Sequence, residues 1–108
     1  MKQDHHRSRT VVQQQLKELD EIFRDTMETL NTVSGMERVA KWRTKTIALL
    51  TEALGKQTGE TFSRVQPGPS FTNDMVEEFT DFIETFKTPL TAIAKQLSTG
   101  DARPPGGA

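Results

Sequence analysis

Several acidic residues in the C-terminal half have the type and spacing of metal ligands. Glu77, Glu78 and Asp81 form the pattern E-E-x-x-D, which places carboxylates one turn apart on a helix. Carboxylate oxygens are ligands that Mg²⁺ prefers, so a metal-dependent hydrolase is one hypothesis. A solvated helix face explains the same residues without any chemistry, and this second interpretation is favoured.

The same segment resembles the first metal-binding helix of all-α nucleotide pyrophosphohydrolases of the MazG type. In that family an E-E-x-x-E helix holds magnesium together with a later E-x-x-D helix. Only the first half has a counterpart here, because Glu84 is the last acid before the C-terminal tail. The resemblance implies a magnesium-dependent nucleotide pyrophosphohydrolase, which is the least favoured of three functions.

The other residues that could do chemistry do not form a catalytic set. Cysteine and tyrosine are absent, which excludes disulfides, thiolate metal sites and thiol catalysis. His5 and His6 fall in the polar residues 1–8, where a general base would lack a fixed geometry. With Asp4 they could chelate a metal weakly, but a solvated tail is favoured. We therefore predict a protein that is not an enzyme and has no metal or cofactor.

A basic segment surrounds the single tryptophan. Arg38, Lys41, Arg43 and Lys45 flank Trp42, and cations interleaved with an aromatic ring can bind phosphates and stack on a base. This pattern makes a nucleic-acid-binding accessory protein the alternative function. Because Trp42 falls on the apolar face of its segment, a tryptophan in the core or an interface, with snorkelling basic neighbours, is favoured.

The overall charge and hydropathy limit the classes of partner. The net charge of −1 argues against binding to nucleic acid or membranes through bulk charge. No apolar run approaches the roughly 18 residues needed to cross a bilayer, and the N-terminus lacks the apolar core of a signal peptide. We expect a cytoplasmic protein. Residues 34–66 carry an excess of three positive charges and residues 67–108 an excess of three negative charges, so helices from these segments should attract each other.

Apolar residues recur at helical spacing in three segments. In residues 9–33 they follow a heptad pattern with Thr26 as the polar position, and Ser34-Gly35 is predicted to end this helix. Residues 36–54 form the second helix, with Gly55 as its C-terminal cap. Residues 55–71 form a connection in which one helical turn fits near residues 61–65, and no sheet is predicted.

The third helix has the clearest periodicity. It is predicted from about Thr72 to residue 98, with Thr72 or Asn73 as its N-cap. Pro89 predicts a kink or break near residues 86–88. The chain should therefore be all-α: an elongated antiparallel three-helix bundle in residues 9–98, between a flexible N-terminus at 1–8 and a flexible Pro/Gly tail at 99–108. The predicted apolar stripe of this helix comprises Val76, Phe79, Ile83, Phe86, Leu90, Ile93 and Leu97.

The length of the apolar stripes suggests a partner. Hydrophobic residues make up only 33% of the chain, and a small elongated bundle hides its stripes incompletely. We predict a helical, coiled-coil-like protein–protein interaction module, either a homo-oligomer such as a dimer or a small subunit of a larger assembly. An equally favoured alternative is that the phenylalanines fill the chain's own core. The predicted interface residues are Phe79, Phe82, Phe86, Trp42, Leu16 and Phe23.

The stretch from Trp42 to Phe62 also resembles a helical segment of bacterial proteins. The pattern is W-x-x-x-T-x-x-L-L-x-x-x-L-G followed by a phenylalanine, and it covers about a fifth of the chain. Several proteins with this segment belong to phage defence, where a helical region precedes a TIR-like or other effector domain. The resemblance implies an oligomerising or regulatory module without catalytic residues. The matching residues are Trp42, Thr46, Leu49, Leu50, Leu54, Gly55 and Phe62.

Overall fold

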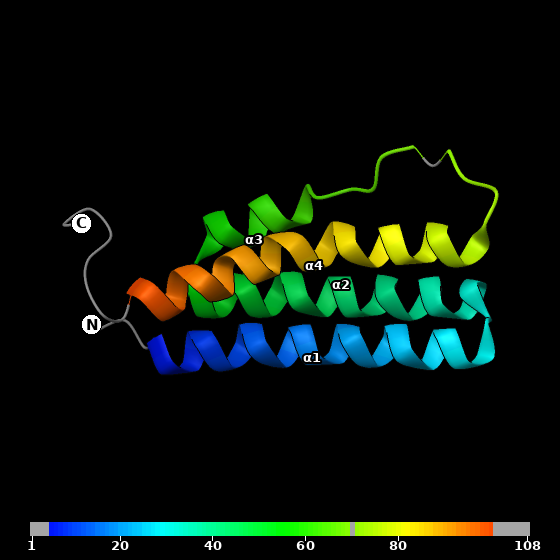
Figure 1. The fold of residues 1–108 in the computed structure, drawn as a ribbon. Helices are drawn as coiled ribbons and strands as arrows, with labels where there is room; N and C mark the ends of the chain where they lie inside the picture. Colours follow the sequence, from blue (N-terminus) through cyan, green and yellow to red (C-terminus); the bar gives the residue numbers. More distant parts are fainter. Residues whose placement is uncertain (1–4, 70, 101–108) are drawn as a thin grey trace.

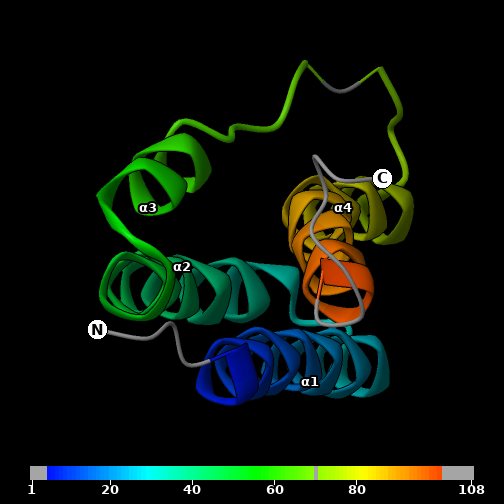
Figure 2. The same cartoon turned by 90° about the vertical axis from the view of Figure 1, so that its left-hand side faces the viewer.

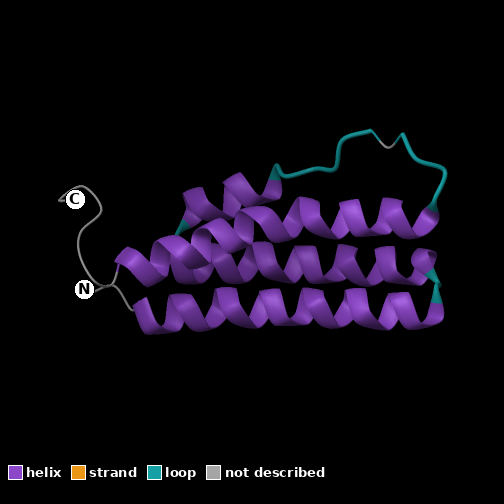
Figure 3. Cartoon of the chain, viewed as in Figure 1, coloured by secondary structure: helices purple, strands orange, loops and turns teal. Residues whose placement is uncertain are grey.

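The computed structural model describes residues 5–69 and 71–100, with side chains placed for residues 6–69 and 71–97. Within these residues the chain consists of helices and loops, without a strand (Figure 3), which confirms the all-α prediction. There are four helices rather than three, because the predicted single turn after Gly55 is a helix of eight residues. The helices are α1 (His5–Thr29), α2 (Thr32–Leu54), α3 (Lys56–Ser63) and α4 (Met75–Gly100).

The three long helices lie side by side in a rod with extents of 47 × 22 × 22 Å (Figure 1). Viewed along the rod, α1, α2 and α4 occupy the corners of a triangle, and α3 packs on the outer side of α2 (Figure 2). α1 runs antiparallel to α2, but α4 runs parallel to α2 (Figure 1). The predicted direction of the last helix was therefore wrong. The reason is that α3 and the described loop residues 64–69 and 71–74 lead the chain back to the end of the rod where α2 begins (Figure 1).

Helix α1 packs between α2 and α4 with a stripe that includes polar residues. Helices α2 and α4 contact α1 on two sides. Leu16 and Phe23 of α1 are only half-buried and pack at the edge of the core. α1 also begins at His5, so the predicted flexible segment 1–8 already contains helix, and Ser8 is fully buried. Residues 1–4 lie outside the described part. The buried stripe of α1 comprises Ser8, Val12, Gln15, Leu19, Ile22 and Thr26.

Two buried polar residues of α1, Ser8 and Gln15, form hydrogen bonds with α2. Thr46 Oγ1 donates to Gln15 Oε1 at 2.9 Å, and Trp42 Nε1 donates to the Gln15 carbonyl oxygen at 2.9 Å. Ser8 Oγ donates to the Ala53 carbonyl oxygen at 3.1 Å. Because an unpaired buried polar group costs free energy, these bonds hold α1 and α2 in one register.

The α1–α2 junction lies four residues before its predicted position. Leu30 has φ 57°, and its N–H donates to the Thr26 carbonyl oxygen at 2.6 Å, so it ends α1 in the left-handed conformation. Asn31 then caps α2 by accepting from the Ser34 N–H at 3.1 Å. Gly35 is not a break. It lies inside α2, where a Cβ atom would approach Thr26 Oγ1 to 2.5 Å.

Helix α4 follows its predicted seam through most of its length. Asp74, rather than Thr72 or Asn73, accepts from the backbone N–H groups of the first turn, at 2.9 Å from Val76 N and 3.2 Å from Glu77 N. α4 continues through Pro89 without a break, and its second half changes direction (Figure 1). Its last residues extend the helix to Gly100, whereas residues 101–108 lie outside the described part. The buried seam residues of α4 are Phe79, Ile83, Phe86, Leu90 and Leu97.

Helix α3 is held by aromatic and charged contacts. Phe62 meets the rings of Trp42 and Phe86 edge-on, at centroid distances of 6.0 and 6.3 Å. The Arg43 guanidinium donates to the carbonyl oxygen of Ser63, the last residue of α3, at 2.7 Å, and to that of Val65 at 3.2 Å. A cation near the C-terminus of a helix also interacts favourably with its dipole, so Arg43 secures α3 and the residues that follow it.

Candidate interaction surfaces

The predicted interface residues lie mainly in the chain's own core. Trp42, Phe79 and Phe86 are buried, with at most 3% of each side chain exposed. Phe82 is half-buried and meets the Phe86 ring edge-on at 5.3 Å. With the half-buried Leu16 and Phe23, these side chains close the space between α1, α2 and α4. The alternative that the phenylalanines fill the core therefore describes the single chain.

Large apolar side chains are exposed elsewhere, at the end of the rod where α1 ends and α2 and α4 begin (Figure 1). Phe71 is 94% exposed, in the extended residues that lead into α4. Single exposed apolar residues are ordinary, but several at one end of a small rod are typical of a binding surface. We call these five residues the apolar end: Leu30, Val33, Phe71, Met75 and Val76.

Leu30 is costly to the isolated chain in two ways. Its side chain is 60% exposed, and its backbone has the left-handed conformation that glycine or asparagine adopts at lower cost. A leucine in this conformation is strained by roughly 1–2 kcal/mol. Nothing within the chain requires a leucine here, since the αL hydrogen bond to Thr26 uses only backbone atoms. Strain at an exposed apolar residue points to a role in recognition.

A second surface feature is an apolar groove between α3 and α4, with a volume of about 600 Å³. Phe62 forms part of its floor, and Lys56 is the charged residue that lines it. Its size falls in the range of sites that bind small molecules or the side chains of a partner. The groove is lined by Leu54, Gly55, Lys56, Gln57, Thr58, Thr61, Phe62, Val65, Pro89, Ala92 and Ile93.

Charge is distributed unevenly along the rod. When each long helix is divided at its middle, one half of the rod comprises residues 18–42 and 67–87. This half, called the acidic half, contains the whole apolar end and has eleven acids against four bases. The other half comprises residues 5–17, 43–66 and 88–100. This basic half contains the whole groove and has eight bases against two acids.

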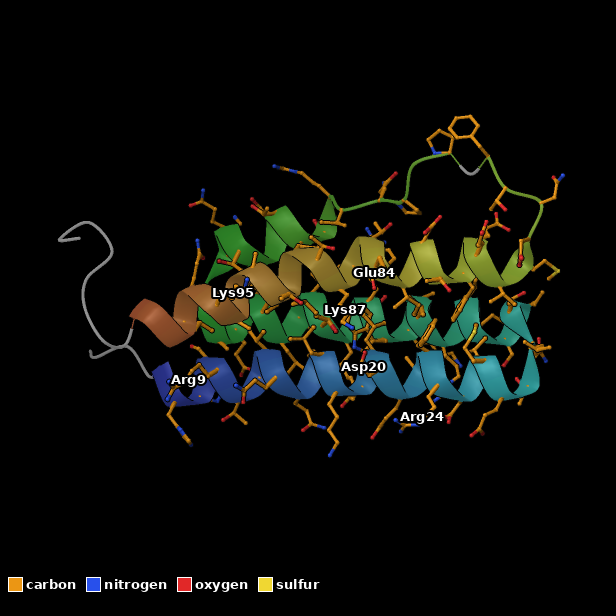
Figure 4. All side chains as sticks on the ribbon, viewed as in Figure 1. Arg9, Asp20, Arg24, Glu84, Lys87 and Lys95 are labelled. Atoms are coloured by element: carbon orange, nitrogen blue, oxygen red, sulfur yellow. The ribbon has the colours of Figure 1, made fainter. Side chains whose placement is uncertain are left out.

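The charges of α1 do not follow its own helix dipole. Arg7 and Arg9 lie near its N-terminus, and Asp25 and Glu28 lie near its C-terminus, whereas the dipole favours the opposite arrangement. α4 runs the other way, with Glu77 and Glu78 in its first turn. Figure 4 shows Arg9 and Lys95 toward the same end of the rod. The dipole of α4 therefore explains its own acids, and the charge order of α1 suits its neighbours α2 and α4, which run the opposite way; α2 pairs with it at Arg7–Glu52 and Asp25–Arg38.

Surface ion pairs connect the helices across the middle of the rod. Lys45 Nζ lies 2.6 Å from Glu18 Oε1, and Arg38 lies 3.1 Å from Asp25 Oδ2, both between α2 and α1. Lys87 of α4 lies 3.4 Å from Asp20 Oδ1 of α1 (Figure 4). Two cations of α2, Arg38 and Lys45, thus pair with acids of α1 rather than with the acids of the last helix. Exposed pairs of this kind contribute little to stability.

These pairs bear on the predicted nucleic-acid residues. Arg38 and Lys45 face carboxylates, and Arg43 is directed into the chain toward α3. Lys41 lines a hollow together with Arg38 and Lys45, and the carboxylates of Glu18 and Glu21 line it too, so its three positive charges are largely balanced within the chain. Trp42 is buried and its indole N–H is bonded to α1, so its ring is not available for stacking on a base.

The predicted magnesium ligands do not converge. Glu77, Glu78 and Asp81 are all exposed, and Glu77 Oε1 accepts from the Thr72 hydroxyl at 2.8 Å. In the part of the chain that the structure describes, no group of three or more His, Cys, Asp or Glu side chains is placed to hold a metal ion. None of the described helices has the length and apolar character needed to cross a membrane.

Four residues of the pattern between Trp42 and Phe62 are core residues. Trp42, Thr46, Leu50 and Phe62 are buried, and they join α2 to α1 and α3. The pattern therefore describes how α3 packs against α2. Comparison with known proteins yields no matching family model, no matching curated protein and no matching solved structure.

The apolar end was not recognised in the sequence as a surface. Leu30, Val33 and Val76 fit the helical periodicity of their segments and were assigned to the seams. The capping residues are the sequence signal that indicates exposure of these side chains, because Asn31 and Asp74 mark where α2 and α4 begin. Residues next to a cap lie at the end of a bundle, where neighbouring helices cover them less.

Proposed function

We propose that this chain is a helical protein–protein interaction module without catalytic activity of its own, acting by self-association or as a small subunit of a larger assembly. The observation that carries the proposal is the apolar end. It exposes five large apolar side chains, whereas the other large apolar side chains of the described residues are buried or half-buried. Aromatic and aliphatic side chains that protrude from a rigid scaffold are the usual anchors of a protein interface.

Two further features support the proposal. Phe71 is 94% exposed and follows Pro67 and Pro69 in the chain. Prolines restrict the backbone, so the loop before Phe71 loses less conformational entropy when a partner binds. The resemblance of the segment from Trp42 to Phe62 to helical regions of bacterial effector proteins also agrees with a non-catalytic module. The partner that the apolar end fits is a protein surface with apolar pockets.

The test compares two variants of the full chain. Phe71→Ser with Met75→Gln removes the two most accessible anchors of the last segment. Leu49→Gln is the matched control, because Leu49 is a half-exposed residue that does not pack against the core. Self-association is measured by sedimentation over a concentration series, and binding to other proteins by quantitative capture from cell extract.

The double variant should lose self-association, or lose a captured protein, by at least tenfold, and the control should keep it. Thermal unfolding followed by circular dichroism should give similar midpoints for both proteins, since neither substitution reaches the buried core. Equal behaviour of the double variant and the wild type in both measurements would refute the proposal.

A further inference from the structure

We infer that a second copy of this chain is the partner of the apolar end, and that two copies pair side by side in antiparallel orientation, with the acidic half of each against the basic half of the other. This inference rests on the proposed function and names its partner. Each apolar end would then lie against the α3–α4 groove of the other copy. The arrangement has two-fold symmetry, so both surfaces of both copies are used and no longer chain grows.

Charge complementarity favours this occupant over others. The apolar end lies among an excess of acids, and the groove lies among an excess of bases, with Lys56 on its lining. A parallel pair would place eleven acids of one copy beside eleven of the other, which is repulsive. In the antiparallel pair every acidic half meets a basic half.

The apolar surfaces are also complementary. The acidic half exposes large side chains that protrude, and the basic half has a groove of about 600 Å³ lined in part by Leu54, Phe62 and Ile93. This volume is sufficient for a phenylalanine side chain and its aliphatic neighbours. Leu30, strained and exposed in one chain, would be covered in the pair, which accounts for a leucine at a position that favours glycine.

A complementation experiment with two full-length variants tests the pairing. The first variant, Leu30→Asn with Phe71→Ser, disables the apolar end. The second, Lys56→Glu with Ala92→Glu, disables the groove; both residues are exposed, and an acid at position 56 suits the N-terminus of α3. The control is Lys17→Glu with Ala48→Glu, which makes the same change of −3 in net charge at exposed positions of the basic half outside the groove.

The wild type and the control should form dimers, and each disabled variant alone should dissociate at least tenfold more readily. Mixing the two disabled variants should produce a heterodimer, because one intact apolar end then meets one intact groove. Fluorescence labelling of one variant and sedimentation of the mixture measure this directly. Dimerisation of the wild type should also weaken between about 0.1 M and about 1 M salt, where the screening length falls from about 10 to about 3 Å.

Three results would overturn the inference. A wild type that stays monomeric at all concentrations excludes the second copy as partner. Disabled variants that do not complement each other exclude contact between the apolar end and the groove. Oligomers of more than two copies exclude the closed antiparallel pair. The proposed function fails separately, because a monomeric wild type that captures another protein through Phe71 would refute this inference and leave the interaction module standing.

Discussion

Replacing Leu30 by asparagine and by alanine separates the strain at this residue from the contacts of its side chain. Leu30 has φ 57° and is 60% exposed. The left-handed conformation costs a residue with a Cβ roughly 1–2 kcal/mol, whereas asparagine adopts it readily. Full burial of a leucine is worth about 1.5–3 kcal/mol, so a side chain that is more than half exposed contributes at most about 1 kcal/mol in the single chain.

Both substitutions remove the same leucine contacts, but only asparagine relieves the backbone. Leu30→Ala should therefore lower the free energy of unfolding by up to about 1 kcal/mol, because alanine keeps the strain. Leu30→Asn should be more stable than Leu30→Ala by about 1 kcal/mol, which corresponds to roughly 4–8 °C in Tm for a domain of this size. Urea unfolding of the dilute, monomeric proteins measures the difference.

The comparison is decisive because the two variants differ only in how well they tolerate this backbone conformation. If asparagine and alanine give the same free energy of unfolding, Leu30 is not strained in solution, and the reasoning about its role fails. If Leu30→Asn is less stable than Leu30→Ala, α1 ends at a residue other than Leu30 in solution. A wild type close in stability to the asparagine variant would still agree with the argument, since lost contacts and relieved strain then offset each other.

Three further predictions concern the packing of the rod. Gly35→Ala should lower the free energy of unfolding by about 1–3 kcal/mol, because the new methyl group would lie 2.5 Å from Thr26 Oγ1, and adding Thr26→Ala should restore part of the loss. Thr46→Val should lower the free energy of unfolding by about 1–3 kcal/mol, because the buried Gln15 Oε1 loses its hydrogen-bond donor. The double variant Thr46→Val with Gln15→Leu should be more stable than Thr46→Val in the same urea assay. Arg43→Met should increase amide hydrogen exchange in α3 by about tenfold, because a methionine side chain has no N–H group to donate to the carbonyl oxygens of Ser63 and Val65; unchanged exchange would exclude this role.

Hydrophobic periodicity was sufficient to predict the long helices and most of the seam of α4. It failed in part of α1, where Ser8 and Gln15 are buried. A count of apolar residues assigns such positions to the surface, since only the partner atoms on α2 show that their hydrogen bonds are satisfied. Periodicity was right where it placed Thr26 on the buried side of α1, and it was one position off where Gln15 rather than Leu16 is buried.

The direction of α4 was not accessible from local pattern. Antiparallel packing of successive helices is the simplest arrangement when connections are short, and the sequence predicts only one helical turn in the connection after α2. In the structure it contains α3, whose docking depends on Phe62 reaching Trp42 and Phe86 across the chain. Such long-range contacts have no signature in a window of neighbouring residues. Similar long-range contacts bury two of the predicted interface residues, since Phe79 stacks on Phe23 of α1 and Phe86 lies against Trp42 of α2.

The segment between α2 and α4 brings the chain back along the rod, and this determines at which end a protein fused to either end of the helical region would lie. α1 begins and α4 ends at the same end of the rod (Figure 1), so anything joined before His5 or after Gly100 emerges at one pole. In an antiparallel pair these poles point away from each other, and the rod is 47 Å long. The pair would then act as a molecular spacer that holds two cargoes at opposite tips and keeps them from touching.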